Sequence, residues 1–148
     1  MNSTPIIDVI IPAFNEEKSI VKVIGDIPKL VRHVVVANNN STDRTAEVAM
    51  EVGAQVVFEP QKGYGKACLT AMEWIKRQEV QPDILVFLDG DYSDYPEELE
   101  DLIAPILADK ADLVIGSRSM GQREVGSMTF PQVFGNGLAT LLMRWMYG

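Results

Sequence analysis

Short runs of β-branched and other apolar residues alternate with amphipathic helical patterns along most of this 148-residue chain. We expect strands at 9–11, 34–36, 56–58, 84–88 and 113–115, and helices at 17–30, after Asp43, at 65–77 and at 96–107. This alternation predicts an α/β fold, with a mainly parallel twisted sheet, right-handed crossovers and helices on both faces. We expect one Rossmann-like, nucleotide-binding type of domain over residues 1–148.

Composition narrows the class of protein further. A chain that is 47% hydrophobic can bury one core, and its net charge of −8 argues against a nucleic-acid partner. Cys68 is the only cysteine, so an intrachain disulfide is impossible and a buried core position is expected. Residues 1–8 lack the basic and apolar segments of a signal peptide, which predicts a cytoplasmic protein.

The last part of the chain differs from the rest. Residues 117–129 are rich in Gly and Ser and predict a flexible loop, and residues 130–147 resume a helical pattern. This terminal amphipathic helix carries enough apolar surface to need a partner. The partner could be a further part of a longer protein, a second copy of the chain in a homo-oligomer, or the inner face of a membrane. We therefore expect a truncated domain.

In open parallel sheets, ligands bind at the carboxyl ends of the strands, so the residues after each strand are the candidate site. After the first strand these are Pro12, Ala13, Asn15 and Glu16, and after the second they are Asn38, Asn39 and Asn40, followed by Ser41–Asp43. Asn15 or Glu16 either caps the next helix or binds a ligand. The three amides either form a polar turn or contact a base or ribose, and Ser41–Asp43 is expected to cap the second helix.

The segment that opens the third predicted helix contains Gly63, Gly65 and Lys66. A lysine at a helix N-terminus is unfavourable unless an anion is bound there, so phosphate contact and a flexible turn both remain open. The segment is neither a P-loop nor a dinucleotide fingerprint, because Ala67 and Cys68 stand where those motifs need other residues.

The fourth predicted strand ends in Asp89, Gly90 and Asp91. Two carboxylates so close disfavour each other's ionisation, and a hard divalent ion relieves this. Mg²⁺ or Mn²⁺ commonly links one or two carboxylates to substrate phosphates, so we expect such a site here, with Gly90 allowing a sharp turn. A solvated acidic turn is the alternative. Asp94 is expected to cap the helix that Pro96 begins.

Arg118 follows the fifth predicted strand and could neutralise a diphosphate leaving group by bidentate hydrogen bonds, or pair with surface acids. Arg123 is a weaker candidate in the same loop. His33, the only histidine, precedes the second strand at the end remote from ligands and is interpreted as structural.

Five motifs in this order resemble the inverting family 2 glycosyltransferases with the GT-A fold, most closely their polyprenyl- or dolichyl-phosphate mannosyl- and glucosyltransferase branch. The motifs are residues 9–17, 40–43, 63–67, 89–91 with Pro96-Glu97, and 116–118. The resemblance implies that Pro12–Glu16 and Asn38–Asn40 hold the nucleoside and that Asp89 lies beside the ribose and diphosphate. It also places Asp91 on the metal, with Lys66 and Arg118 on the diphosphate or sugar.

The sequence departs from this family at three places. Asn38 and Asn39 stand where the family usually has acids, and Ser93 stands where the branch often has Gln or His as a further metal ligand. The resemblance also implies an acceptor-binding half, which we would expect to follow residue 148 in a longer protein.

The functional hypothesis is a metal-dependent, DXD-type transferase of cell-envelope biogenesis. It transfers a hexose from a UDP- or GDP-sugar with inversion to an acceptor such as a polyprenyl phosphate at the membrane surface or another cell-envelope glycan precursor, with Asp89, Asp91 and Arg118 as catalytic residues. The main alternative is a truncated module that binds the nucleotide sugar without turnover. A sugar nucleotidyltransferase would need a Gly-rich basic loop after the first strand, and a phospho-acceptor receiver domain would need an acid pair there. Neither fits Pro12–Asn15.

Overall fold

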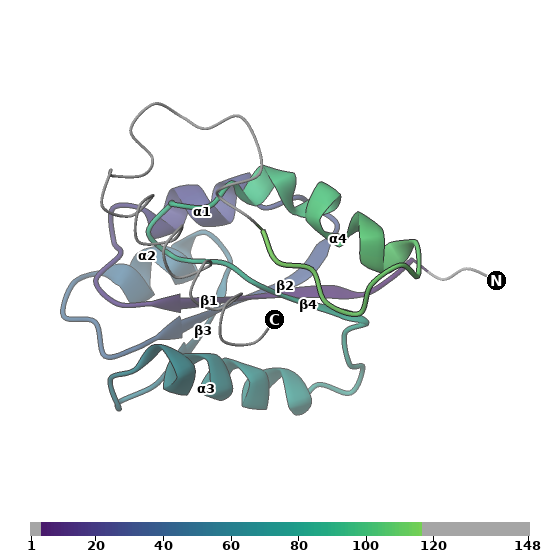
Figure 1. Ribbon diagram of the computed structural model, residues 1–148. Helices are drawn as coiled ribbons and strands as arrows, with labels where there is room; N and C mark the ends of the chain where they lie inside the picture. The colour runs from purple at the N-terminus through teal and green to yellow at the C-terminus, as the bar shows by residue number, and fades with distance from the viewer. Residues whose placement is uncertain (1–3, 117–148) are drawn as a thin grey trace, which may run out of the picture. The chain divides into compact units, whose positions relative to one another are not determined.

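The computed structural model describes residues 4–116, and the compact unit that ends at Val114 contains every helix and strand assigned within them (Figure 1). The strands are β1 (Ile7–Ala13), β2 (Val31–Asn38), β3 (Gln55–Phe58) and β4 (Ile84–Phe87). The helices are α1 (Ile20–Asp26), α2 (Thr45–Glu51), α3 (Tyr64–Lys76) and α4 (Leu99–Leu107), with a 3₁₀ turn, η1 (Pro96–Glu98), before α4.

The four strands form one parallel sheet in the order β3-β2-β1-β4. β1 lies between two strands and is buried along its whole length, as the apolar run Val9–Ile11 at its centre favours. Residue pairs such as Val9–Val34 and Val9–Val86 fix the register on its two sides. Because all strands are parallel, their carboxyl ends meet at one edge of the sheet, and the predicted α/β class is confirmed.

Helices cover both faces of the sheet, as predicted (Figure 1). Val9, Ile11 and Ala13 pack in a cluster with α1, α2 and α4, whereas Ile10 faces α3. The α3 side of that second cluster is built mainly from the small residues Ala67 and Ala71, which let the helix lie close to the strands.

Three local expectations are corrected. The predicted helix at 17–30 is shorter, because Pro28 disfavours a helical conformation at Ile27, whose ψ is 129°. Cys68 is only partly buried, since it lies one position off the α3 stripe that faces the sheet. The run at 113–115 is not a strand; Leu113 is 76% and Ile115 79% exposed, and neither is paired with a described strand.

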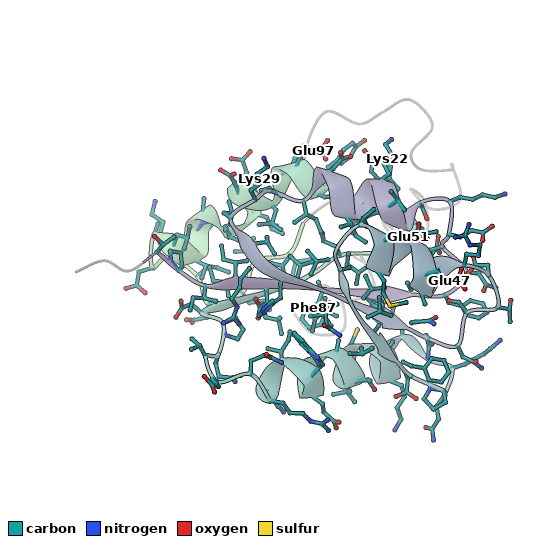
Figure 2. The ribbon with its side chains drawn as sticks, turned by 180° about the vertical axis from the view of Figure 1, so that it is seen from behind. Lys22, Lys29, Glu47, Glu51, Phe87 and Glu97 are labelled. Carbon is teal, nitrogen blue, oxygen red and sulfur yellow. The ribbon has the colours of Figure 1, made fainter. Side chains whose placement is uncertain are left out.

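The fourth strand is also less covered than its sequence suggests. β4 forms one edge of the described sheet, and Phe87 is 43% exposed on the face that α3 covers (Figure 2). Its apolar character therefore does not make it a central strand. None of the helices within residues 4–116 is long and apolar enough to span a membrane.

A network of charged residues lies at the amino ends of the strands, opposite the candidate site. Asp8 of β1 is completely buried and forms two hydrogen bonds with Arg32, Nε–Oδ1 at 3.0 Å and a terminal guanidinium nitrogen to Oδ2 at 2.6 Å. The backbone N–H of His33 also donates to Asp8, and the His33 ring packs edge-on against Trp74. Hydrogen bonding to Asp8 raises the pKa of Arg32, which is the mark of a tight pair. His33 thus belongs to a structural network, as its sequence position suggests.

Candidate functional site

The loops that follow β1 and β2 are joined by hydrogen bonds. Asn15, in a left-handed conformation with φ of 58°, donates its backbone N–H to Ser41 Oγ at 3.0 Å. Its side-chain Oδ1 accepts from the backbone N–H of Thr42 at 2.8 Å, and the Glu16 N–H donates to Thr45 Oγ1 at 2.7 Å. The Asn15 side-chain oxygen therefore holds the loop after β1 against the loop after β2. These bonds fix the relative positions of the two loops at the carboxyl edge of the sheet.

The start of α2 is stabilised by two acids that precede its N-cap residue, Arg44, and Asp43 accepts a hydrogen bond from a first-turn N–H, as predicted. Asp43 Oδ1 accepts from the backbone N–H of Thr45 at 3.0 Å, and Glu17 Oε2 accepts from that of Arg44 at 3.0 Å. Burial on its own would raise the pKa of Asp43, but hydrogen bonds from Thr45 and Glu17 outweigh it and lower the pKa. The carboxylate is thus held ionised at the positive end of the helix dipole.

Asn38 and Asn39 are both nearly buried, at 8% and 7% exposure. Asn38 Oδ1 accepts from the Ser41 N–H at 3.0 Å. The Asn39 carboxamide makes three bonds to the loop before α3: its Nδ2 donates to the carbonyls of Glu59 and Gln61, and its Oδ1 accepts from the Gly63 N–H at 2.8 Å. Of the two roles that the sequence left open for these amides, Asn39 takes the structural one.

Asn39→Asp is expected to destabilise the fold by roughly 2 kcal/mol, because a carboxylate would face two carbonyl oxygens that now receive hydrogen bonds. Urea unfolding followed by circular dichroism measures the change. Asn40→Asp is the matched control, since Asn40 is exposed and its left-handed φ of 61° also suits aspartate. Equal stabilities of the two variants would contradict the role given to Asn39.

The acidic turn after β4, residues 89–94, packs against the end of β1. Asp89 is half-buried, Asp91 is exposed, and Gly90 between them is buried. A Cβ added at Gly90 would lie 3.4 Å from Glu16 Cγ and 3.5 Å from Ala13 Cβ, so the two strand ends are in contact here. The positive φ of this turn falls at Tyr92 (63°) rather than at Gly90. Gly90 has no left-handed backbone conformation, which corrects its expected role in the turn, and a Cβ at this position would make ordinary van der Waals contacts with the end of β1.

Two further hydrogen bonds order the acidic turn. The Asp89 N–H donates to Asp94 Oδ2 at 3.2 Å, and the Ser93 N–H donates to Asp91 Oδ1 at 2.9 Å. Asp94 thus closes the acidic turn through the Asp89 N–H, and its capping of the helix that Pro96 begins stays a prediction. Ser93 itself is exposed.

The donor chemistry of this turn suits a divalent cation. Asp89 and Asp91 supply hard carboxylate oxygens at the strand edge, of the kind that bind Mg²⁺ and Mn²⁺. Within residues 4–116 no group of three or more His, Cys, Asp or Glu side chains is arranged to hold a metal by itself. An ion bound to one or two carboxylates commonly takes its remaining ligands from water and substrate phosphates.

Tyr64 is a residue near this turn that the sequence pattern did not identify. It begins α3, and its hydroxyl donates to Asp89 Oδ1 at 3.3 Å. Partial burial, followed by the Asp89 charge, raises the pKa of Tyr64 to about 12, so the phenol remains a hydrogen-bond donor at neutral pH. The sequence signal that could have identified Tyr64 as a site residue is its position between two glycines at the start of a predicted helix.

The residues next to Tyr64 in the chain belong to the loop before α3 and to the first turn of that helix. Gly63 has a φ of 147°, which favours glycine, whereas a side chain at Gly65 would meet no atom within 4 Å. Lys66 is exposed in the first turn of α3, and the Lys62 ammonium lies 4.5 Å from the centroid of the Phe14 ring. Lys62 and Lys66 therefore lie near the carboxyl edge of the sheet and are exposed to solvent.

The structure thus brings several predicted residues to one edge. Glu16 and Ala13 lie beside Gly90, while Pro12 and Ala13 are buried within β1. Arg118 and Arg123, the predicted loop at 117–129 and the predicted helix at 130–147 lie outside the described residues.

Known proteins with similar sequences and structures identify the family of this chain. The family model described as Glycosyl transferase family 2 matches residues 8–147. An uncharacterized glycosyltransferase of Mycobacterium tuberculosis is 39% identical over 140 residues, which are 94% of this chain and 58% of that protein. A UDP-N-acetylglucosamine–dolichyl-phosphate N-acetylglucosaminyltransferase of Methanococcus voltae is 27% identical over 88% of this chain and 59% of its own.

A solved structure agrees with the sequence comparison. Glucosyl-3-phosphoglycerate synthase of M. tuberculosis, in complex with Mn²⁺, UDP and glucosyl-3-phosphoglycerate, superposes with a TM-score of 0.60 at 31% identity. The match covers 70% of this chain and 40% of the synthase. The present chain spans little more than half the length of the curated relatives named above. On its sequence, its parallel sheet and these matches, the chain belongs to glycosyl transferase family 2, with the GT-A fold.

Proposed function

We propose that this chain forms the donor-binding part of an inverting glycosyltransferase that uses a UDP- or GDP-hexose. The observation that carries the proposal is the Asp89–Gly90–Asp91 turn, packed against the end of β1 at the carboxyl edge of a family 2 domain. Binding of UDP and Mn²⁺ by the similar synthase favours UDP as the nucleotide and Mn²⁺ or Mg²⁺ as the ion.

In this proposal Asp91 and Asp89 hold the divalent ion against the donor diphosphate. The ion, when bound, supplies charge neutralisation for the leaving group. Tyr64 donates a hydrogen bond to Asp89 Oδ1, which orients that carboxylate, and Lys66 lies near the α3 N-terminus, where an anion is favoured. Glu16 lies beside Gly90, so the loop after β1 forms the second wall of the donor site.

The chemical step forms one bond and breaks another at the anomeric carbon. An acceptor oxygen attacks opposite the diphosphate, the bond between that carbon and the diphosphate oxygen breaks, and the nucleoside diphosphate leaves with the electron pair. Arg118 is proposed to stabilise this leaving group. A lipid phosphate acceptor is already ionised and needs little help from a general base.

We propose a polyprenyl phosphate, or another precursor of a cell-envelope glycan, as the acceptor. The dolichyl-phosphate specificity in the name of the M. voltae relative supports this choice. The reaction would then take place at the cytoplasmic face of a membrane.

Isothermal titration calorimetry with UDP, GDP and ADP tests donor binding directly. We expect UDP or GDP to bind at least about tenfold more tightly with Mn²⁺ than with EDTA, because the ion links carboxylates to phosphates, and ADP to bind more weakly. If UDP and GDP both fail to bind, the donor-site proposal is wrong. Sugar transfer from UDP-glucose or GDP-mannose, with and without a polyprenyl phosphate, then separates a transferase from a module that only binds the donor.

A further inference from the structure

The acidic turn is connected to α1 by the side chain of Tyr92. The Tyr92 hydroxyl donates to Asp26 Oδ2 at 2.5 Å, and the Lys22 ammonium lies 3.7 Å from the centroid of the Tyr92 ring. Lys22 and Asp26 are one helical turn apart on α1, so they present an acceptor and a cation from the same side of the helix (Figure 2 labels Lys22). Both contacts are made by a residue directly after Asp91.

The backbone of Tyr92 explains why such an anchor is needed. Its φ of 63° is unfavourable for a bulky residue and persists only where surrounding contacts hold it. In this conformation the chain turns, and the next N–H, that of Ser93, reaches Asp91 Oδ1 at 2.9 Å. The direction of the Asp91 carboxylate therefore depends on the conformation at Tyr92, and that conformation depends on α1.

We propose that Tyr92, held by Asp26 and Lys22, is a positioning residue that presets the Asp91 carboxylate for its cation. This inference rests on the proposed function, because it assumes a divalent ion at Asp91. A carboxylate that is already oriented binds a metal with less loss of conformational freedom. Tyr92 itself does not touch the ion or the sugar in this scheme; it acts through the turn.

Tyr92→Phe and Asp26→Ala test the anchor in the whole chain. One net hydrogen bond corresponds to roughly a two- to tenfold effect, so each variant should raise the Kd for Mn²⁺, measured with saturating UDP, by about three- to tenfold. Hydrogen exchange measured by mass spectrometry should accelerate in residues 88–95 by a similar factor, while Tm changes little. The double variant should show no larger effect than either single one, because both remove the same contact.

Two control variants separate positioning from a general loss of structure. Asp26→Asn keeps an acceptor for the Tyr92 hydroxyl and should restore most of the Mn²⁺ affinity, whereas Glu73→Ala, an exposed acid on α3, should change neither readout. Unchanged exchange in residues 88–95, or faster exchange with an unchanged Kd, would overturn the inference while the proposed function stands. Failure of the unmodified chain to bind Mn²⁺ with either UDP or GDP would instead count against the proposed function, and exchange would still report whether Tyr92 holds the turn.

Discussion

Asp91→Ala is expected to weaken Mn²⁺-dependent UDP binding at least about a hundredfold, while the free energy of unfolding stays within about 0.5 kcal/mol of the unmodified chain. The affinity falls because the substitution removes one of the two carboxylates that are proposed to hold the ion. Stability is kept because Asp91 is exposed and the hydrogen bond that it accepts from the Ser93 N–H lies at the surface. Calorimetry with Mn²⁺ and with EDTA gives the affinity, and urea unfolding gives the stability.

Asp101→Ala is the matched control for this experiment. Asp101 is also an exposed aspartate, but it lies on α4 rather than in the acidic turn, so its loss should leave the Mn²⁺-dependent affinity unchanged. If the Asp91 variant retains its metal-dependent affinity, Asp91 is not a metal ligand. A loss of similar size in the Asp101 variant would show that overall charge, rather than direct ligation, controls binding.

Asp8→Ala is expected to lower the free energy of unfolding by about 3 kcal/mol. Asp8 is completely buried and accepts hydrogen bonds from Arg32 and from the His33 backbone, so its removal leaves these donors without their acceptor. The Arg32 side chain is 26% exposed, so it keeps some contact with water after Asp8 is removed. The expected loss of stability is therefore at the lower end of the range for a broken buried ion pair. Urea unfolding followed by circular dichroism measures the change.

A double-mutant cycle identifies the source of that loss. In an Arg32→Ala background the loss of stability caused by Asp8→Ala should be smaller by at least about 1 kcal/mol. The reason is that the Arg32 guanidinium, which Asp8→Ala would otherwise leave without its partner, is already absent. Asp112→Ala, at an exposed aspartate, should change stability by less than about 0.5 kcal/mol. Equal costs of Asp8→Ala in the two backgrounds would show that the Asp8–Arg32 pair is not the cause.

Local patterns in the sequence determined the elements and their approximate positions. The alternation of apolar runs with helical periodicity predicted the α/β class, because periodicity records which face of each element is buried. It also placed Asp89 and Asp91 at the end of a strand, and the loop chemistry predicted the capping role of Asp43. These features depend on residues close together in the chain.

The tertiary structure decided the contacts between distant segments. The order β3-β2-β1-β4 placed the fourth strand at an edge and left the apolar run at 113–115 without a described partner, although both read as buried strands. The Asn39 bonds to the loop before α3, the Tyr64 bond to Asp89 and the Tyr92 bond to Asp26 join residues 20 to 66 positions apart. The burial of one face of an element produces a periodic pattern of apolar residues in the sequence. The pairing of distant segments depends on strand order and crossover connections, which a local pattern does not show.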